Sequence, residues 1–248
     1  MMELTVNEIL HDEITKLDYT LIPPGYHGDV RSMRLMQDNL NKLINEIGEQ
    51  SAAAQGLNRV ITTAEKMRNS PDNTLFLLKD SLTNQGHGAL IGLLKVGYKK
   101  LYLFDPRNKV REVEPLCVLD FFITQDHQRI GYGRVLFDYM LQALEVHPYE
   151  LAIDGPSTKM EQFLAKNYGI DNLLRQNNNF AVAAQFFDNV VDISNKSGRS
   201  TPAIVAAVGR FAAAKPPSAI ANVIHGGTPY YNDSNNGYVR ARRAMNTH

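Results

Sequence analysis

A strand that runs through a glycine turn into a helix constrains this sequence more than any other feature. Residues Leu116–Ile123 form an apolar, β-branched and aromatic run, which is the composition of a buried strand. A turn with two glycines follows at Gln128–Gly133, and apolar residues then recur at helical spacing over Val135–Leu144. Such a helix start presents free backbone N–H groups and the positive end of the helix dipole, which favour an anion such as a phosphate. A tight packing turn without a ligand is the alternative.

Composition narrows the class of protein. The 26 basic and 26 acidic side chains balance over 248 residues, so no global field attracts nucleic acid or an anionic membrane. The longest apolar stretches are too short to span a bilayer, and the first residues do not read as a secretory signal. The single cysteine cannot form an internal disulfide, and the seven histidines form no cluster with metal-ligand spacing. We therefore expect a cytoplasmic protein without a metal and without nucleic-acid or membrane partners. A monomer is a separate expectation, which the composition does not decide.

The order of the expected elements predicts an α/β (α+β) fold with a mixed central sheet flanked by helices. A long amphipathic helix is expected from Arg31 until its pattern fades near Ser51–Gly56, and Thr62 or Thr63 is expected to cap a second helix through Met67. A third helix follows the glycine turn, and Ser157 caps a fourth. Strands are expected at Thr74–Lys79, Ala89–Val96, Lys99–Phe104, Leu116–Ile123, Tyr149–Ile153 and Phe180–Phe187.

The chain is predicted to divide into a folded domain at residues 1–188 and a tail at residues 189–248. The tail is rich in Ala, Asn, Ser, Gly and Pro, and its seven basic and two acidic side chains give a net charge of +5. This composition predicts a low-complexity, basic and disordered segment. Within it, Pro202–Ala214 has the spacing of a short helix.

The Gln-x-x-Gly-x-Gly of the turn, placed between this strand and this helix, resembles the pyrophosphate-binding motif of the GCN5-related N-acetyltransferases. Three further segments, Leu94–Leu101, Glu112–Phe121 and Leu151–Ser157, look like those of the α-tubulin N-acetyltransferases, a divergent family of that superfamily. The resemblance covers about residues 3–187. It implies the GCN5-related acetyltransferase fold, with residues 1–188 as catalytic domain. It also implies acetyl transfer from acetyl-CoA to the lysine of the α-tubulin loop that faces the microtubule lumen, by direct attack in a ternary complex.

The resemblance implies a coenzyme site built from three segments. The pyrophosphate would lie on the backbone amides of the turn, where glycines allow close approach, and the pantetheine arm would lie along the strand. Lysines of a later helix would supply cations for phosphate, although a solvated helix face is the alternative for them. The candidates are Phe121, Phe122, Ile123 and Thr124 in the strand; Gln128, Arg129, Ile130, Gly131, Tyr132, Gly133 and Arg134 at the turn; and Ser157, Lys159 and Lys166 in the later helix.

Three residues are candidates for catalysis by the same resemblance. Asp154 is the candidate base for a lysine whose free pKa is about 10.4; burial would have to raise its own pKa, or it would orient the ammonium. A plain helix-entry residue is the alternative. Cys117 is a supporting candidate, whereas its apolar strand alone favours a small core residue, and no adjacent histidine is present to activate a covalent relay. Gln55, at the end of the long helix, is the third candidate. The sequence alone would indicate an ordinary surface or helix-end glutamine.

Lys95, Lys99 and Lys100 form a small basic cluster. The resemblance implies that Lys95 and Lys99 bind the acidic tubulin substrate, and an ordinary surface cluster is the alternative. The family usually has arginine where this chain has Gly155, next to the candidate base. This difference bears on the expected rate of turnover more than on the expected fold. Two other functions stay open: an acetyltransferase for other lysines, small amines or protein N-termini, and a microtubule-associated protein that keeps the fold with little catalysis.

Overall fold

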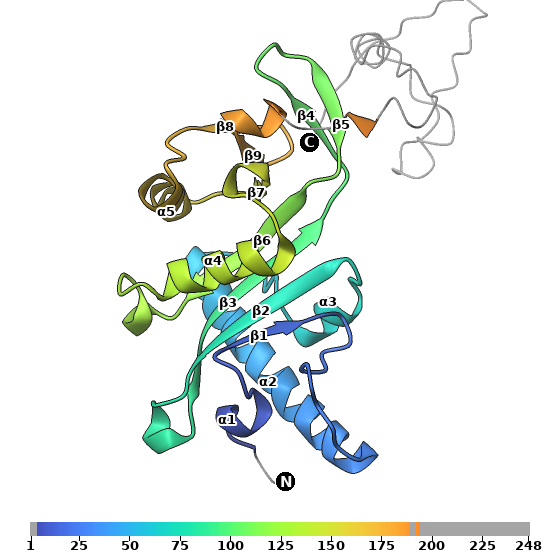
Figure 1. Ribbon diagram of the computed structural model, residues 1–248, viewed down its shortest axis with the longest axis vertical. Helices are drawn as coiled ribbons and strands as arrows, with labels where there is room; N and C mark the ends of the chain where they lie inside the picture. The colour runs from blue at the N-terminus through green and yellow to red at the C-terminus, as the bar shows by residue number, and fades with distance from the viewer. Residues whose placement is uncertain (1–3, 189–191, 194–248) are drawn as a thin grey trace, which may run out of the picture. The chain divides into compact units, whose positions relative to one another are not determined.

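The computed structural model describes residues 4–188 and 192–193, and its centre is a seven-stranded sheet with helices on both faces (Figure 1). The strand order is β1-β2-β3-β6-β7-β9-β8, in which β6 and β7 are the parallel pair and the other neighbouring pairs are antiparallel. The strands are β1 Ile14–Leu17, β2 Asn73–Asp80, β3 Ala89–Tyr98, β4 Leu101–Phe104, β5 Val110–Val113, β6 Leu116–Ile123, β7 Ala152–Asp154, β8 Leu173–Arg175 and β9 Phe180–Ala183. The α-helices are α1 Val6–Ile9, α2 Val30–Gln55, α3 Ala64–Arg68, α4 Tyr132–Leu144 and α5 Thr158–Tyr168. The predicted fold class, a mixed sheet flanked by helices, is confirmed.

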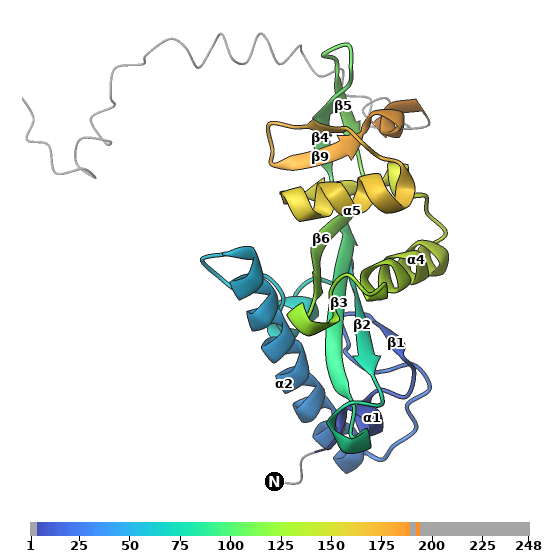
Figure 2. The ribbon, with the colours of Figure 1, turned by 90° about the vertical axis from the view of Figure 1, so that its left-hand side faces the viewer.

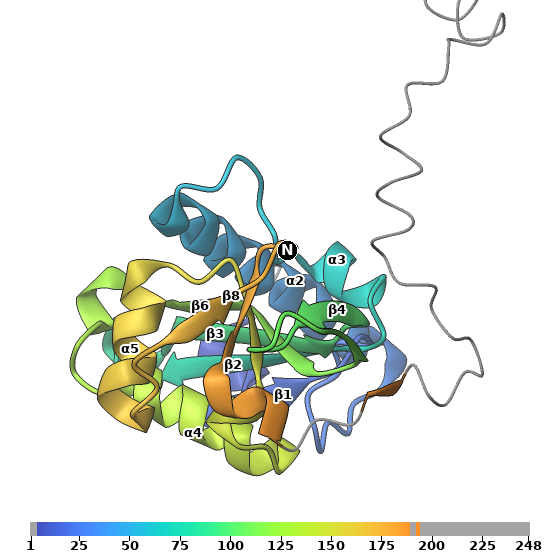
Figure 3. The same cartoon turned by 90° about the horizontal axis from the view of Figure 1, so that it is seen from above.

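The helices form two layers, one on each face of the sheet. In β2, Leu75 and Leu77 pack with buried residues of α1, α2 and α3, whereas Phe76 and Leu78 pack with those of α4 and α5. Because successive side chains of a strand point to opposite faces, an almost wholly apolar strand needs a helix layer on each side. Figure 2 shows α2 on one side of the sheet and α4 on the other, and Figure 3 shows the same arrangement from above.

The long helix α2 has a distinct start and stop. The Asp29 carboxylate accepts the Ser32 N–H at its beginning, and Gly56 ends it with a φ of 66°. Glycine adopts this left-handed conformation without the penalty that a Cβ brings, so the helix stops where the apolar pattern fades. The helix expected from Arg31 to about Ser51–Gly56 is confirmed, and Thr63 caps α3 as one of the two expected candidates.

A hairpin of β4 and β5 forms a second, two-stranded sheet that extends from one end of the main sheet (Figure 1). Its buried residues Leu101, Leu103 and Val113 pack on Cys117 of β6 and Phe186, and so form a third apolar cluster. The hairpin is therefore anchored to the strands that carry two of the predicted catalytic residues.

The boundaries of several elements differ from the prediction. Residues Pro148–Glu150 form a 3-10 turn, so the strand expected at Tyr149–Ile153 begins only at Ala152; Ala184–Asp188 is likewise a 3-10 turn that shortens the strand expected at Phe180–Phe187. The hairpin strand expected from Lys99 begins at Leu101. Strands β1, β5 and β8 were not predicted, because three- or four-residue strands carry too little alternation to stand out.

The predictions for the tail lie outside the described residues, and the boundary at residue 188 stays a prediction. None of the described helices has both the length and the apolar character that crossing a membrane requires.

Candidate active site

The two parallel strands at the centre of the sheet separate soon after they meet. They pair over two residue couples, Cys117 with Ala152 and Val118 with Ile153. Strand β7 then ends at Asp154, whereas β6 continues to Ile123. At the same level the pairing of β6 with β3 skips Leu119, and such a bulge bends a strand.

The separation leaves one edge of β6 open. From Leu119 to Ile123, β7 supplies no strand partner on that edge. Unpaired backbone N–H and C=O groups at a strand edge can bind an extended chain that carries amides. The pantetheine arm of coenzyme A is such a chain, so this edge fits the group that the sequence predicted beside β6.

The glycine turn leads from this edge into α4. Gly131 is the N-cap residue with a φ of 109°, a conformation that residues with a Cβ rarely adopt. The nearest atoms to a Cβ added at Gly133 would be those of Phe121 at 3.5 Å and Phe163 at 3.7 Å, which is ordinary contact. The Gln128 side chain donates to the Ile123 carbonyl at 2.7 Å and so fixes the turn to the end of β6.

The two glycines therefore have different roles. Gly131 is required by the backbone of the turn, while the protein itself leaves room for a side chain at Gly133. The N-terminus of α4, with its orphan N–H groups, is a suitable place for a phosphate. This arrangement is compatible with the predicted pyrophosphate site, which stays a prediction.

The coenzyme candidates in β6 face different helix layers. Phe122 and Ile123 are buried, in the core clusters of α2 and α4 respectively, and Phe121 is half-buried in an aromatic cluster with Phe137 and Phe163. Any contact of Phe122 or Ile123 with a ligand would therefore come from the backbone edge more than from the side chains.

The remaining coenzyme candidates are placed as follows. The Thr124 hydroxyl is hydrogen-bonded to the His127 ring at 2.9 Å, and the exposed Arg134 pairs with Asp138 at 3.2 Å. Ser157 is the N-cap of α5 and accepts the Met160 N–H, a structural role that needs no ligand. The other four side chains at the turn and on α5 are exposed or half-buried: Ile130, Tyr132, Lys159 and Lys166. Arg129 adopts a positive φ of 66° within the turn.

Asp154 lies at the point where β7 ends. It is exposed, whereas the base argued from the sequence needed burial against aromatic rings. Asn179 donates to its Oδ1 at 3.2 Å, and the Gly155 N–H donates to the Asn179 carbonyl at 2.9 Å. The carboxylate is thus held at the strand end and open to an approaching cation, which favours the orienting role over the basic one.

Cys117 is fully buried, and it pairs with Ala152 in the first of the two paired positions of β6 and β7. Its Sγ lies 3.5 Å from the Pro115 carbonyl. Burial raises the pKa of this thiol to about 12; the nearby Asp154 acts in the same direction and Lys99 opposes it. A protonated thiol is a poor nucleophile, so the geometry favours packing over a covalent relay.

Gln55 is the last residue of α2 and its side chain turns toward β6. The amide Nε2 donates to the Ser51 hydroxyl at 2.8 Å and to the Asp120 carboxylate at 2.9 Å. Asp120 lies in β6 and is 3% exposed; it also accepts from the hydroxyls of Ser51, at 2.8 Å, and Thr62. The structure thus brings Gln55, Cys117 and Asp154 to the same stretch of the β6–β7 separation.

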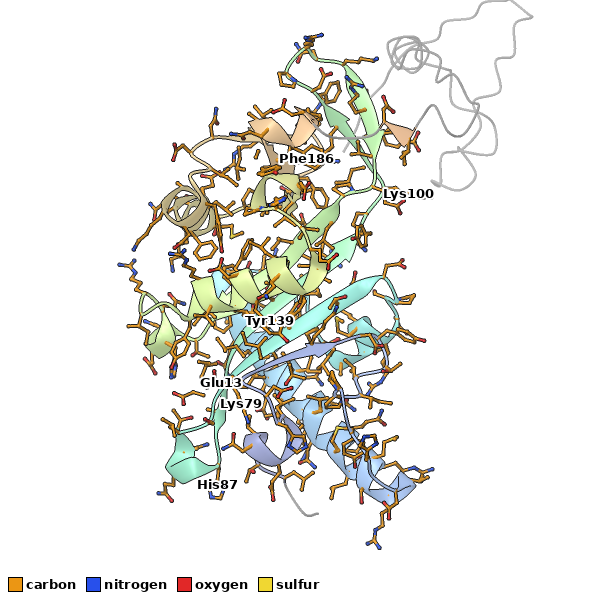
Figure 4. All side chains as sticks on the ribbon, viewed as in Figure 1. Glu13, Lys79, His87, Lys100, Tyr139 and Phe186 are labelled. Atoms are coloured by element: carbon orange, nitrogen blue, oxygen red, sulfur yellow. The ribbon has the colours of Figure 1, made fainter. Side chains whose placement is uncertain are left out.

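The prediction of an exposed basic cluster is wrong for Lys95. This side chain is 6% exposed, and its ammonium donates to the Ile61 carbonyl at 2.7 Å. Burial lowers the pKa of Lys95 to about 8, although the charge of Asp120 opposes the shift. Lys99 is half-buried and Lys100 is exposed at the base of the hairpin, where Figure 4 labels it. Lys95 also lines a small cavity of about 210 Å³ with Lys66, Asn69, Ser70 and Asn73 among its walls.

Sequence reasoning missed Asp120 and Asn179. The signal for Asp120 was present, because a charged residue in the middle of an apolar strand is rarely buried without partners. Nothing local pointed to Asn179, which lies in a loop of three asparagines and meets Asp154 only through the pairing of β7 with β9. Among the described residues, no three His, Cys, Asp or Glu side chains gather as metal ligands.

The sequence is similar to known proteins over most of its length. Residues 2–206 match the family described as "GNAT acetyltransferase, Mec-17". The chain is 41% identical over 192 residues to "Alpha-tubulin N-acetyltransferase" of Aedes aegypti, covering 77% of this chain and 70% of the relative. It is 43% identical over 195 residues to the protein of the same name from Trichoplax adhaerens, covering 75% and 82%. It is 44% identical over 184 residues to "Alpha-tubulin N-acetyltransferase 1" of Danio rerio, covering 74% and 61%.

Solved structures are more distant. "Crystal structure of Arabidopsis thaliana NAA60 in complex with a bisubstrate analogue" is 13% identical, covers 56% of this chain and 90% of that one, and has a TM-score of 0.38. This likeness is too weak to place any residue.

Proposed function

The chain belongs to the Mec-17 family of GNAT acetyltransferases, and we propose that it transfers acetyl from acetyl-CoA to the side-chain amine of a lysine in α-tubulin. The lysine is the one in the loop that faces the microtubule lumen, so the enzyme would work in the cytoplasm on the cytoskeleton. The observation that supports this substrate is the similarity to curated relatives named alpha-tubulin N-acetyltransferase, at 41% identity over 192 residues and 43% over 195.

The donor would be held by the open edge of β6 and by the start of α4. The unpaired backbone beyond Val118 supports an extended pantetheine arm, and the N–H groups after Gly131 support its pyrophosphate. Bound there, acetyl-CoA supplies an activated acetyl thioester. The open space beside Gly131 supports close approach of the coenzyme to the turn, since no protein atom outside its chain neighbours lies within 4 Å of the position of a Cβ there.

The acceptor lysine would be guided by Asp154 and Gln55. Asp154 offers an exposed carboxylate at the end of β7, which attracts and orients the ammonium form. Gln55 offers a carboxamide whose nitrogen is already bonded within the protein. The ammonium would lose one proton to solvent, and the neutral amine would attack the thioester carbonyl directly, since the protonated Cys117 thiol does not favour an acetyl-enzyme. The carbon–sulfur bond then breaks, and coenzyme A leaves as a thiol after it takes the second proton of the amine.

Charge around the hairpin supports an acidic partner. Lys100 is exposed at the base of the β4–β5 hairpin (Figure 4), and Lys99 beside it is half-buried. Exposed cations at the rim of a site raise the rate of encounter with an acidic surface. We keep Lys99 as a substrate-binding candidate, and Lys95 only as a residue that supports the site from within.

The test is acetyl transfer from labelled acetyl-CoA to taxol-stabilised microtubules. Wild type and Asp154→Asn are compared, with tubulin in which arginine replaces the loop lysine as the matched substrate control. We expect label on wild-type tubulin only, and a large loss in Asp154→Asn with coenzyme binding kept. Transfer to histones or polyamines but not to tubulin would point to another acetyltransferase. Binding to microtubules and coenzyme without transfer would indicate a member of the family with little catalysis.

A further inference from the structure

The buried Asp120 carboxylate connects three segments beside the site. It lies in β6, and it accepts hydrogen bonds from Ser51 and Gln55 of α2 and from Thr62 in the segment after α2. At 3% exposure, an ionised carboxylate without such partners would be costly, so the hydrogen bonds explain how it is tolerated. They do not explain why an otherwise apolar strand carries a carboxylate at this place.

The consequence for Gln55 gives a reason. An ionised carboxylate only accepts hydrogen bonds, so the amide nitrogen of Gln55 must face Asp120 and its oxygen must point elsewhere. The nitrogen donates to both neighbouring oxygens, the Ser51 hydroxyl at 2.8 Å and the Asp120 carboxylate at 2.9 Å. An exposed helix-end glutamine, which would otherwise sample several rotamers, therefore has its carboxamide fixed in one orientation.

A second charge supports the arrangement. Lys95 of β3 is opposite Asp120 of β6 in the strand pairing, and each is at least nine-tenths buried. The Lys95 ammonium bonds to the Ile61 carbonyl, next to Thr62, so both charges bind the same segment between α2 and α3. The two opposite charges on paired strand positions attract each other, and their hydrogen bonds hold the segment against the sheet.

We propose that Asp120 is a positioning residue, which fixes the Gln55 carboxamide so that its oxygen accepts a hydrogen from the amine of the acceptor lysine. A neutral primary amine keeps its lone pair free for attack while one N–H is held by an acceptor. Gln55 then selects the orientation of the nucleophile, and Asp120 acts through it without touching the substrate. This inference rests on the proposed acetyl transfer to a lysine.

Four variants of the full chain test the proposal by kinetics. Asp120→Ala removes the acceptor that fixes Gln55, and we expect kcat to fall between about tenfold and a hundredfold with acetyl-CoA affinity unchanged. Asp120→Asn keeps an oxygen at this place and is expected to retain kcat within about fivefold. Thr62→Val is the matched control, because it takes a hydrogen bond from the other carboxylate oxygen; its kcat is expected to stay within about threefold even where its melting temperature falls. Asp120→Val, which fills the buried space without an acceptor, takes the place of Asp120→Ala if that variant does not fold.

A readout without turnover separates this inference from the proposed function. In ¹⁵N NMR, the side-chain amide of Gln55 is expected to be ordered in wild type and Thr62→Val, and mobile in Asp120→Ala or Asp120→Val. A mobile Gln55 amide in wild type overturns the inference even where tubulin is acetylated. Loss of kcat that follows melting temperature in every variant, Thr62→Val included, also overturns it. An ordered amide in a wild type that does not acetylate tubulin contradicts the proposed function alone.

Discussion

Replacement of Cys117 by alanine separates a packing role from a covalent one. Cys117 is fully buried, and burial raises the pKa of its thiol to about 12. At pH 7 the thiolate fraction is then about 10⁻⁵, compared with roughly 3% for a free cysteine of pKa about 8.5. Because the thiolate is the attacking form, its population for a covalent relay would be about 3,000-fold lower than for an ordinary cysteine.

The cost of the substitution is a packing cost. The sulfur belongs to the cluster that joins the β4–β5 hairpin to β7 and β9. Loss of one buried sulfur atom is expected to lower the free energy of unfolding by about 1 kcal/mol. We therefore expect Cys117→Ala to keep kcat within about threefold, since no step of direct attack needs the thiol.

The assay uses the fact that Cys117 is the only cysteine in the 248 residues. Intact mass measured after rapid quenching reports any acetyl-cysteine, and the rate of alkylation by iodoacetamide reports access to the thiolate. We expect no acetyl-enzyme, and alkylation that becomes fast only in denaturant. An acetyl group trapped on Cys117, or a loss of kcat above a hundredfold in a Cys117→Ala variant that keeps its stability, would refute the reasoning.

The same pKa predicts a dependence of stability on pH. In the unfolded chain the thiol loses its proton near pH 9, whereas the folded chain keeps the proton until about pH 12. Stability from this group is therefore fully present below pH 9 and is lost as the pH rises toward 12. At pH 10 the loss is about 1.4 kcal/mol, and it should be absent from Cys117→Ala in urea unfolding.

Three further predictions concern other residues. Gly131→Ala should lower the free energy of unfolding by about 1–3 kcal/mol because of its φ of 109°, and should weaken acetyl-CoA binding in calorimetry because its Cβ would enter the open space beside the turn; Gly133→Ala should be neutral or stabilising. Burial lowers the pKa of Lys95 to about 8, so below pH 8 the charged side chain lowers the free energy of unfolding by about 3 kcal/mol. This loss disappears by about pH 10.5, and Lys95→Met should abolish the resulting rise of stability with pH in urea unfolding. A Cβ at Gly155 would lie 2.8 Å from the Asn179 amide nitrogen, so Gly155→Ala and Asn179→Ala should each lower kcat, and the double variant no further. Equal stability of Gly131→Ala and Gly133→Ala would contradict the first prediction. An unchanged dependence of stability on pH in Lys95→Met would contradict the second, and additive losses of kcat in the Gly155→Ala, Asn179→Ala double variant would contradict the third.

The parts of the fold that could be predicted from the sequence are those with local signals. The apolar run of β6 and the helical spacing of α4 lie within single short windows, and their bounds agree with the structure. The cap of α3 at Thr63 and that of α5 at Ser157 depend on one side chain and a neighbouring N–H, so they could also be predicted. Strand β1 has four residues and is fixed by its pairing with β2, some sixty residues later in the sequence, which no local window contains.

The site was predicted only in part for a similar reason. The resemblance supplied Gln55, Cys117 and Asp154 as single residues, but not the contacts between them and their surroundings. Asp120 meets Thr62 across 58 residues of sequence and Ser51 across 69, so the network exists only after the sheet and α2 have packed. The burial of Lys95 could not be predicted from its lysine neighbours, since it depends on the α2–α3 segment that covers it.

The three catalytic candidates together favour orientation over covalent chemistry. Cys117 is buried and protonated, Asp154 is exposed and held by Asn179, and Gln55 is anchored through its nitrogen. None of these is arranged as an activated nucleophile, whereas in our proposal Asp154 and Gln55 would present fixed acceptors to an incoming amine. Correct placement of a bound amine and a thioester can supply several kcal/mol of a barrier without a covalent intermediate. A site built at the open edge of β6, with its acceptors fixed by the neighbouring elements, is suited to that form of catalysis.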